Sequence, residues 1–146
     1  MAGGSTGAAV FRAIALGWAL VTAACTSVVT DARSLAGTNW RVAALNGTPT
    51  PASGFEMSFT ADELAAHFGC NRGSGNYRII GNTMHTGPIA ATQMACASAT
   101  DEGPDPMALE RMGFAVISQP MRIEWRSGRE LRLTSAAGSI DLQSVP

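Results

Sequence analysis

Short alternations of apolar and polar residues, separated by tight-turn residues, run through most of this 146-residue sequence. The segment 55–59 (Phe-Glu-Met-Ser-Phe) is the clearest case, because alternation places its three apolar side chains on one face of a strand. The pairs Asn46-Gly47 and Gly81-Asn82 are typical of tight hairpin turns. Short strands at this spacing indicate a closed or partly open antiparallel β-barrel, lipocalin-like in outline, or a sandwich.

We expect about seven to eight short strands. They cover residues 40–45, 55–59, 63–70, 77–80, 83–86, 121–126, 130–134 and 139–143. Within 63–70, alternation puts Phe68 and Cys70 on one face and His67 on the other. Residues 71–76 are rich in Asn, Gly and Ser, and we expect a loop there.

One segment does not show the alternation that is typical of strands. Asp105 followed by Pro106 is typical of a helix N-cap and first helical position. The apolar residues that follow give one helix face up to about Ile117, and Pro120 ends the helix. The fold class is therefore mainly β with one helix (α+β), the helix following Cys96.

The first 24 residues resemble a signal peptide of the lipoprotein type. Arg12 supplies a positive charge, and residues 13–21 form an apolar stretch shorter than the roughly 20 residues that span a bilayer. Small residues then precede Cys25, although Thr22 stands where a larger aliphatic residue is usual. We expect a lipid on Cys25, with signal cleavage without acylation as the alternative.

Residues 25–34 are expected to tether the domain to its membrane. Thr26 is not Asp, and by resemblance to Gram-negative lipoproteins this implies the outer membrane, facing the periplasm. A secreted or periplasmic location is the alternative. After Cys25 the chain has nine Arg, no Lys and eleven acidic residues, a net charge of −2. We expect no nucleic-acid partner, and we expect a monomer.

Cys70 and Cys96 stand 26 positions apart. An oxidising compartment favours a disulfide between them. Three alternatives stay open: two reduced core thiols, a zinc site completed by His67 and His85, or a nucleophilic pair of Cys70 with His85. The opposite strand faces of His67 and Cys70 argue against zinc. No acidic residue stands near Cys70 or His85 in sequence to orient a general base. We expect no metal and no cofactor.

Three short motifs, in this order, resemble the META domain, also called the HslJ-like family. They are Leu35-x-Gly37-Thr38-x-Trp40, Gly69-Cys70-Asn71 and Thr92-x-Met94-Ala95-Cys96. The resemblance covers residues 35–143, so we assign 35–146 to one domain. It implies a small, mainly β domain with a helix, common on secreted or lipid-anchored bacterial proteins. Some members are linked to heat shock or antibiotic tolerance, and the family has no established catalytic activity.

These features predict a non-catalytic, lipid-anchored envelope protein that acts as a stress-related binding or structural module. The first alternative is a carrier or pilot-like module for a hydrophobic ligand or secretion partner, and the second is a thiol-dependent enzyme. Five aromatic side chains are expected in the core, with a ligand-holding barrel mouth as the alternative: Trp40, Phe55, Phe59, Phe68 and Trp125. Four charged residues are expected on a solvated outer face, with a contact to anionic lipid or polysaccharide as the alternative: Arg122, Glu124, Arg126 and Arg132.

Overall fold

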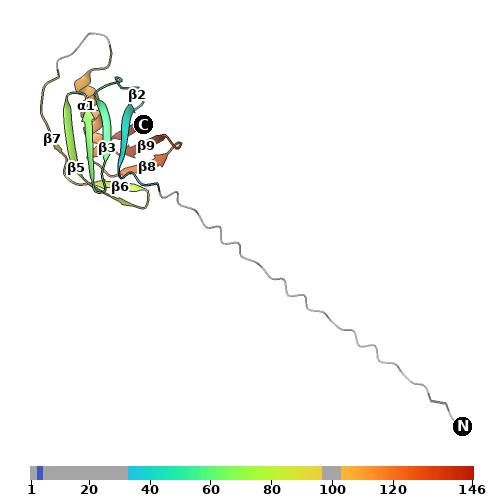
Figure 1. The fold of residues 1–146 in the computed structure, drawn as a ribbon. Coiled ribbons are helices and arrows are strands. Elements are labelled where there is room, and N and C mark those ends of the chain that lie inside the picture. The colour runs from blue at the N-terminus through green and yellow to red at the C-terminus, as the bar shows by residue number, and fades with distance from the viewer. Residues whose placement is uncertain (1–2, 5–32, 97–102) are drawn as a thin grey trace. The chain divides into compact units, whose positions relative to one another are not determined.

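Eight antiparallel strands close into a barrel in the computed structural model, because the last strand pairs back onto the first. In order around the barrel they are β1 (Thr38–Leu45), β3 (Phe55–Phe59), β4 (Glu63–Phe68), β5 (Asn71–Ile80), β6 (Thr83–Thr86), β8 (Met121–Trp125), β9 (Glu130–Ser135) and β10 (Gly138–Ser144). Two short strands add to this wall: β2 (Thr48–Pro49) pairs with β1, and β7 (Ala90–Ala91) pairs with β5 (Figure 1). Closure leaves the eight barrel strands without a long free edge.

The structure describes residues 3–4, 33–96 and 103–146. The expected signal peptide, Cys25 and all but the last two residues of the expected tether lie outside the described residues. Within the described residues no helix has the length and apolar character needed to cross a membrane.

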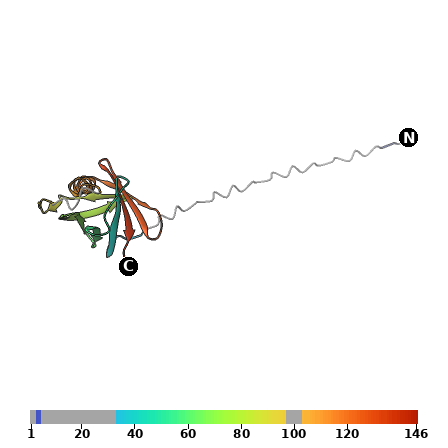
Figure 2. The ribbon, with the colours of Figure 1, turned by 90° about the horizontal axis from the view of Figure 1, so that it is seen from above.

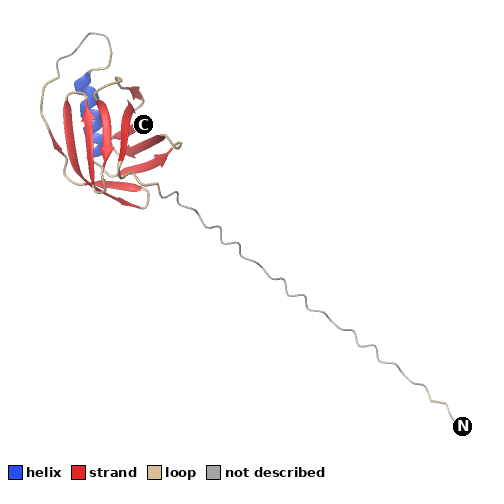
Figure 3. Ribbon diagram, in the orientation of Figure 1, coloured by secondary structure: helices blue, strands red, loops and turns tan. Residues whose placement is uncertain are grey.

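A single helix, α1 (Pro106–Ile117), is found where the sequence predicts it. The Asp105 carboxylate accepts a hydrogen bond from the Met107 amide at 2.9 Å, and Pro106 occupies the first turn, where its missing N–H costs nothing. The helix packs against β1, β4, β9 and β10, and Figure 3 shows it behind the strands. Figure 2 views it almost along its axis, beside the curved wall of the barrel.

The barrel interior is filled by apolar side chains from the strands and α1. Trp40, Phe55, Phe59 and Phe68 are all at most 4 % exposed, as predicted for the core. Trp125 is only half-buried: it packs against the core, and its ring centroid lies 5.8 Å from that of Trp40. Four of the five predicted core aromatics are thus buried, and the fifth lies at the rim.

The predicted loop at 71–76 is wrong, because these residues form the first half of β5. A Cβ on Gly73 would lie 2.5 Å from Cε1 of Phe114, and one on Gly75 would lie 2.7 Å from the carbonyl oxygen of Pro88. Both glycines therefore allow close packing of neighbouring segments onto an ordinary strand. The sequence analysis took Gly73 and Gly75 as turn residues, whereas they stand in a strand against which neighbouring segments pack closely.

The predicted strand 63–70 ends early, at Phe68. Gly69 has φ +70°, a left-handed conformation that glycine adopts without strain, and it turns the chain before Cys70. The alternation of side chains along β4 therefore ends before Cys70, and it does not determine on which side of the sheet Cys70 lies relative to His67. His67 itself lies on the outer face of β4, between Glu56 and Arg72.

Charged residues cover the outer face of the C-terminal strands, as predicted. Glu124 pairs with Arg122 at 2.9 Å and with Arg126 at 3.1 Å. Arg132 donates two hydrogen bonds to Asp141, at 2.6 and 2.8 Å, and these bonds raise the pKa of the Arg132 guanidinium above its usual value. This side of the barrel is a network of paired charges.

We predict that Gly113→Ala destabilises the protein, although alanine favours helices. A Cβ at position 113 would lie 2.6 Å from the ring of Phe68, which is fully buried and has no room to move. Overpacking of this kind costs about 1–3 kcal/mol. Urea unfolding followed by tryptophan fluorescence measures the change. Gly128→Ala is the matched control, since its Cβ meets nothing within 4 Å; equal midpoints for the two variants would contradict the prediction.

Candidate functional site

The Asn71 side chain connects three parts of the fold at the barrel end where β5 begins. Asn71 is 2 % exposed. Its Nδ2 donates to the Met94 carbonyl oxygen at 2.8 Å and to the two Glu110 carboxylate oxygens at 2.9 and 2.8 Å. Its Oδ1 accepts from the Met94 amide and from the Thr92 hydroxyl, both at 2.7 Å. We call this set of hydrogen bonds the Asn71 clamp.

A disulfide fixes the same segment two residues further on. It joins Cys70 to Cys96 with a Cα–Cα distance of 5.6 Å. The Cys96 Sγ lies 3.8 Å from a Glu110 carboxylate oxygen, and the Cys96 amide contacts the Met107 sulfur at 3.4 Å. The clamp and the disulfide together attach residues 92–96 to both β5 and α1.

The first motif lies at the opposite end of the barrel. Gly37 has φ +78°, and its amide donates to the Phe59 carbonyl oxygen at 2.8 Å. The Trp40 indole N–H donates to the Thr38 hydroxyl at 2.7 Å, and that hydroxyl donates to the Leu35 carbonyl oxygen. Leu35 itself is 2 % exposed. These bonds hold residues 35–37 across this end of the barrel, where they cover its opening.

The motif residues therefore form two separate sets. Gly69, Asn71, Thr92 and Met94 meet around the disulfide, whereas Gly37, Thr38 and Trp40 seal the other end. Both sets satisfy backbone groups that the fold would otherwise leave unpaired, which is a structural task.

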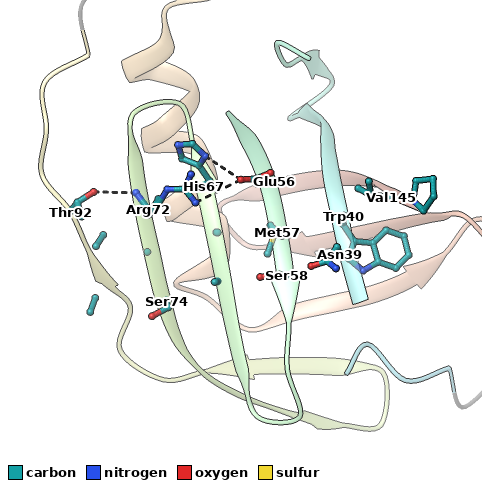
Figure 4. Close-up of a pocket in the computed structure, with 16 residues that line it drawn as sticks. Asn39, Trp40, Glu56, Met57, Ser58, His67, Arg72, Ser74, Thr92 and Val145 are labelled. Atoms are coloured by element: carbon teal, nitrogen blue, oxygen red, sulfur yellow. Dashed lines mark hydrogen bonds and ion pairs between the residues drawn. The ribbon is translucent and has the colours of Figure 1, made fainter. Parts of the chain in front are cut away.

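A groove of about 730 Å³ lies on the outer face of β3, β4 and β5 (Figure 4). Strand register places small side chains in one row across its floor: Ser58, Ala65, Ser74 and Ala90. At one end of this row stand Asn39 on β1 and the C-terminal Val145. Because the floor side chains are short, an occupant can approach the sheet closely.

Charged side chains line the groove along the neighbouring row. Glu56 Oε1 lies 3.5 Å from His67 Nδ1 and 3.7 Å from an Arg72 guanidinium nitrogen, as Figure 4 shows. The His67 side chain is 16 % exposed, and its Nδ1 is buried without a hydrogen-bond partner. Glu56 and Arg72 are largely exposed, so the groove offers charge of both signs to an occupant.

The Asn71 clamp also holds the wall of this groove. The Thr92 hydroxyl that donates to Asn71 accepts a hydrogen bond from the Arg72 amide at 3.1 Å. The Thr92 amide donates to the Arg72 carbonyl oxygen at 2.9 Å. The position of Arg72 along the groove thus depends on bonds made by the motif residues.

The structure does not bring together the residues of the zinc and nucleophile alternatives. His85 pairs with Arg78 on β5, eight residues beyond Cys70, which is about 26 Å along a strand. Cys70 and Cys96 are oxidised to the disulfide. Among the described residues no three His, Cys, Asp or Glu side chains gather closely enough to hold a metal ion.

Sequence reasoning identified the clamp's motif residues but missed Glu110 and the groove. A signal for Glu110 was present, since it lies three residues from both Met107 and Gly113 and so shares their helix face. The groove had no such signal, because its floor is made of Ala and Ser on the outward positions of strands. Such residues are common on any solvent-facing strand.

We predict that Asn71→Ala lowers the free energy of unfolding by about 2–4 kcal/mol. The change removes the partners of the buried Glu110 carboxylate and of the part-buried Met94 amide and carbonyl. Urea unfolding measures the loss. Asn76→Ala is the control, because the exposed Asn76 makes only a 3.4 Å bond to the Asp62 carbonyl oxygen; a loss as large in that variant would refute the argument.

The disulfide is expected to contribute about 3–4 kcal/mol by closing a loop of 26 residues. Replacing both Cys70 and Cys96 with Ala should lower stability by that amount in urea unfolding. Alkylation of the protein without reductant, read by mass spectrometry, should label neither cysteine. Two labelled thiols in protein purified without reductant would be incompatible with the bond.

Comparisons with known proteins agree with this architecture. Two solved NMR structures are similar in fold: one has a TM-score of 0.61 at 20% identity and covers 75% of this chain and 90% of its own. The other, from Burkholderia xenovorans, has a TM-score of 0.55 at 16% identity and covers 76% and 83%. No curated protein matches the chain. The family model of the META domain matches residues 33–143, and the chain therefore belongs to the META domain family.

Proposed function

We propose that this protein is a lipid-anchored, non-catalytic component of the cell envelope that binds an extended polypeptide segment of a partner in the groove over β3, β4 and β5. The groove is the observation that carries the proposal. Its volume of about 730 Å³ lies within the range of ordinary ligand sites. The anchoring rests on the apolar stretch 13–21 and on Cys25.

The lining of the groove suits an extended chain. Its floor crosses several strands in a row of Ser and Ala side chains, so a polypeptide backbone can lie flat against it. Glu56 and Arg72 flank the row and offer partners for charges of either sign. Val145, half exposed at the β1 end of the row, offers an apolar contact.

A role under envelope stress is the second part of the proposal. It rests on the likeness to family members linked with heat shock or antibiotic tolerance. The closed barrel and the disulfide support it physically, because both oppose unfolding of the binding surface when the temperature rises. A binding surface that has to function during heat shock has to stay folded through it.

The alternative functions have less support. A hydrophobic ligand inside the barrel would have to displace side chains that are almost fully buried, among them Met57, Leu64 and Leu142. A thiol-dependent enzyme would need a free thiolate, whereas both cysteines that the structure describes are bonded to each other.

The groove is tested by Ala65→Tyr, which fills its floor from the outer face of β4. In a strain that lacks the gene and is challenged with heat or an antibiotic, this variant should fail to restore tolerance. It should also lose, in photocrosslinking in living cells, the adduct that the parent forms. Thr134→Tyr is the matched control, since Thr134 lies on β9, across the barrel from β4.

Both variants should keep the parent's urea midpoint, because both positions face outward. Full tolerance and an unchanged adduct with Ala65→Tyr would contradict binding in the groove. Mass spectrometry of the protein extracted from membranes should find a mature chain that begins at Cys25 and carries acyl chains. A chain that begins elsewhere or carries no acyl chain would show that the lipid anchor is wrong.

A further inference from the structure

We propose that one end of the barrel lies directly on the phospholipid bilayer and inserts the tip of the β5–β6 hairpin into the headgroup region. This inference rests on the lipid anchor of the proposed function. We call this end the entry end, and it is formed by residues 33–37, the hairpin tip 79–82 and the turn 127–128.

Hydrogen bonds and strand register place these three segments at the same end. The Asn82 carbonyl oxygen accepts from the Ile123 amide at 2.8 Å, which puts the hairpin tip beside the middle of β8. Two residues further along β8, the Arg33 guanidinium lies 5.4 Å from the centre of the Trp125 ring. Arg33 also donates to the Ser127 carbonyl oxygen at 3.0 Å. Figure 1 shows the chain entering the barrel close to β6 and β8.

Exposed apolar side chains gather at the entry end. The large apolar side chains most exposed among the described residues are Ile79 (41%), Ile80 (59%), Met94 (58%) and Val145 (50%). The two isoleucines sit on the hairpin tip. Val145 belongs to the same end, because its amide donates to the carbonyl oxygen of Asn39 near the start of β1. Only Met94 lies elsewhere, beside the disulfide.

The hairpin turn does not require these isoleucines. The Gly81-Asn82 pair makes the turn, and Gly81 adopts φ +64°. Exposing two adjacent isoleucines to water is unfavourable, whereas a bilayer interface would take up their apolar surface. A neighbouring lipid surface accounts for their place on the tip.

Charges at the entry end are nearly balanced. Arg33, Arg78 and Arg129 lie there, and Arg126 is paired with Glu124. The exposed Arg78 and Arg129 are the arginines placed to contact lipid phosphates. Asp62 and Glu130 lie at the same end and offset part of this attraction. The contact therefore depends chiefly on the isoleucines, with the arginines at its margin.

The length of the tether favours the bilayer as the occupant. Arg33 is eight residues after Cys25, and eight extended residues reach about 29 Å at most. Acyl chains on Cys25 would hold the entry end within that distance of the headgroups. The other barrel end lies further away by up to the length of β4, six residues or about 20 Å. The end that carries the isoleucines is the one that the anchor keeps near the membrane.

The test uses vesicles of phosphatidylethanolamine and phosphatidylglycerol with brominated acyl chains, which quench tryptophan at short range. Trp40 and Trp125, the two tryptophans after Cys25, both lie at the entry end and serve as probes. The chain is compared as the acylated protein and as the unacylated Cys25→Ser variant without residues 1–24, so that the apolar stretch 13–21 and Trp18 are absent from both. In each background the double variant Ile79→Asn/Ile80→Asn is set against Met94→Gln, a control whose side chain is as exposed as that of Ile80.

We expect the unacylated chain to partition onto the vesicles with quenched tryptophan fluorescence. The partition coefficient of the double isoleucine variant should be lower than that of its parent by a factor of about ten or more, and Met94→Gln should match its parent. In the acylated protein the double variant should stay on the vesicles but lose the quenching. Equal partition and equal quenching in the isoleucine variant and its parent would overturn the inference.

The two proposals fail in distinguishable ways. If the protein purified from membranes carries no lipid and does not sediment with vesicles, the anchor is wrong, and the Cys25→Ser comparison still decides whether the entry end binds lipid. If the acylated protein sediments but its tryptophans are not quenched, the anchor is right and the contact of the entry end with the bilayer is wrong. All variants should keep the parent's urea midpoint, because the replaced side chains are exposed.

Discussion

The hydrogen bonds of the Asn71 carboxamide are the constraint on which most of this structure depends. A single buried side chain satisfies the Met94 amide and carbonyl, the Thr92 hydroxyl and the Glu110 carboxylate. The backbone of Met94 is not paired with a neighbouring strand. The Asn71 carboxamide makes the hydrogen bonds to its amide and carbonyl that a strand would otherwise make. The disulfide keeps the segment attached covalently, but the carboxamide determines how the segment is oriented.

The clamp links the scaffold to the surface that we propose as functional. Thr92 bonds to Asn71 on one side and to the backbone of Arg72 on the other. The clamp therefore also holds the groove wall in position. Binding to a preformed surface avoids the entropy cost of ordering it. The residues that resemble the family motif therefore mostly support the site from behind, and apart from Trp40 and Thr92 the residues that line the groove lie outside the motif.

Sequence patterns of a few neighbouring residues predicted those elements whose ends are determined by the same few residues. Asp105 and Pro106 marked the start of the helix, and Asn46-Gly47 marked a turn in which both residues have positive φ. The strand at 71–76 could not be predicted, because its glycines are required by Phe114 and Pro88, which are distant in sequence. The same holds for Glu110: its helix face was readable, but its partner Asn71 was not.

The pairing of β1 with both β3 and β10 gives the barrel a particular response to force. The chain enters at the start of β1, whose ladders to β3 and β10 run from Thr38 to Leu45. A pull applied at Thr38 along the axis of β1 acts on both ladders together. It loads several backbone hydrogen bonds of the two ladders in shear at once, instead of opening them one after another. A barrel closed in this way resists extraction of its first strand under such a pull.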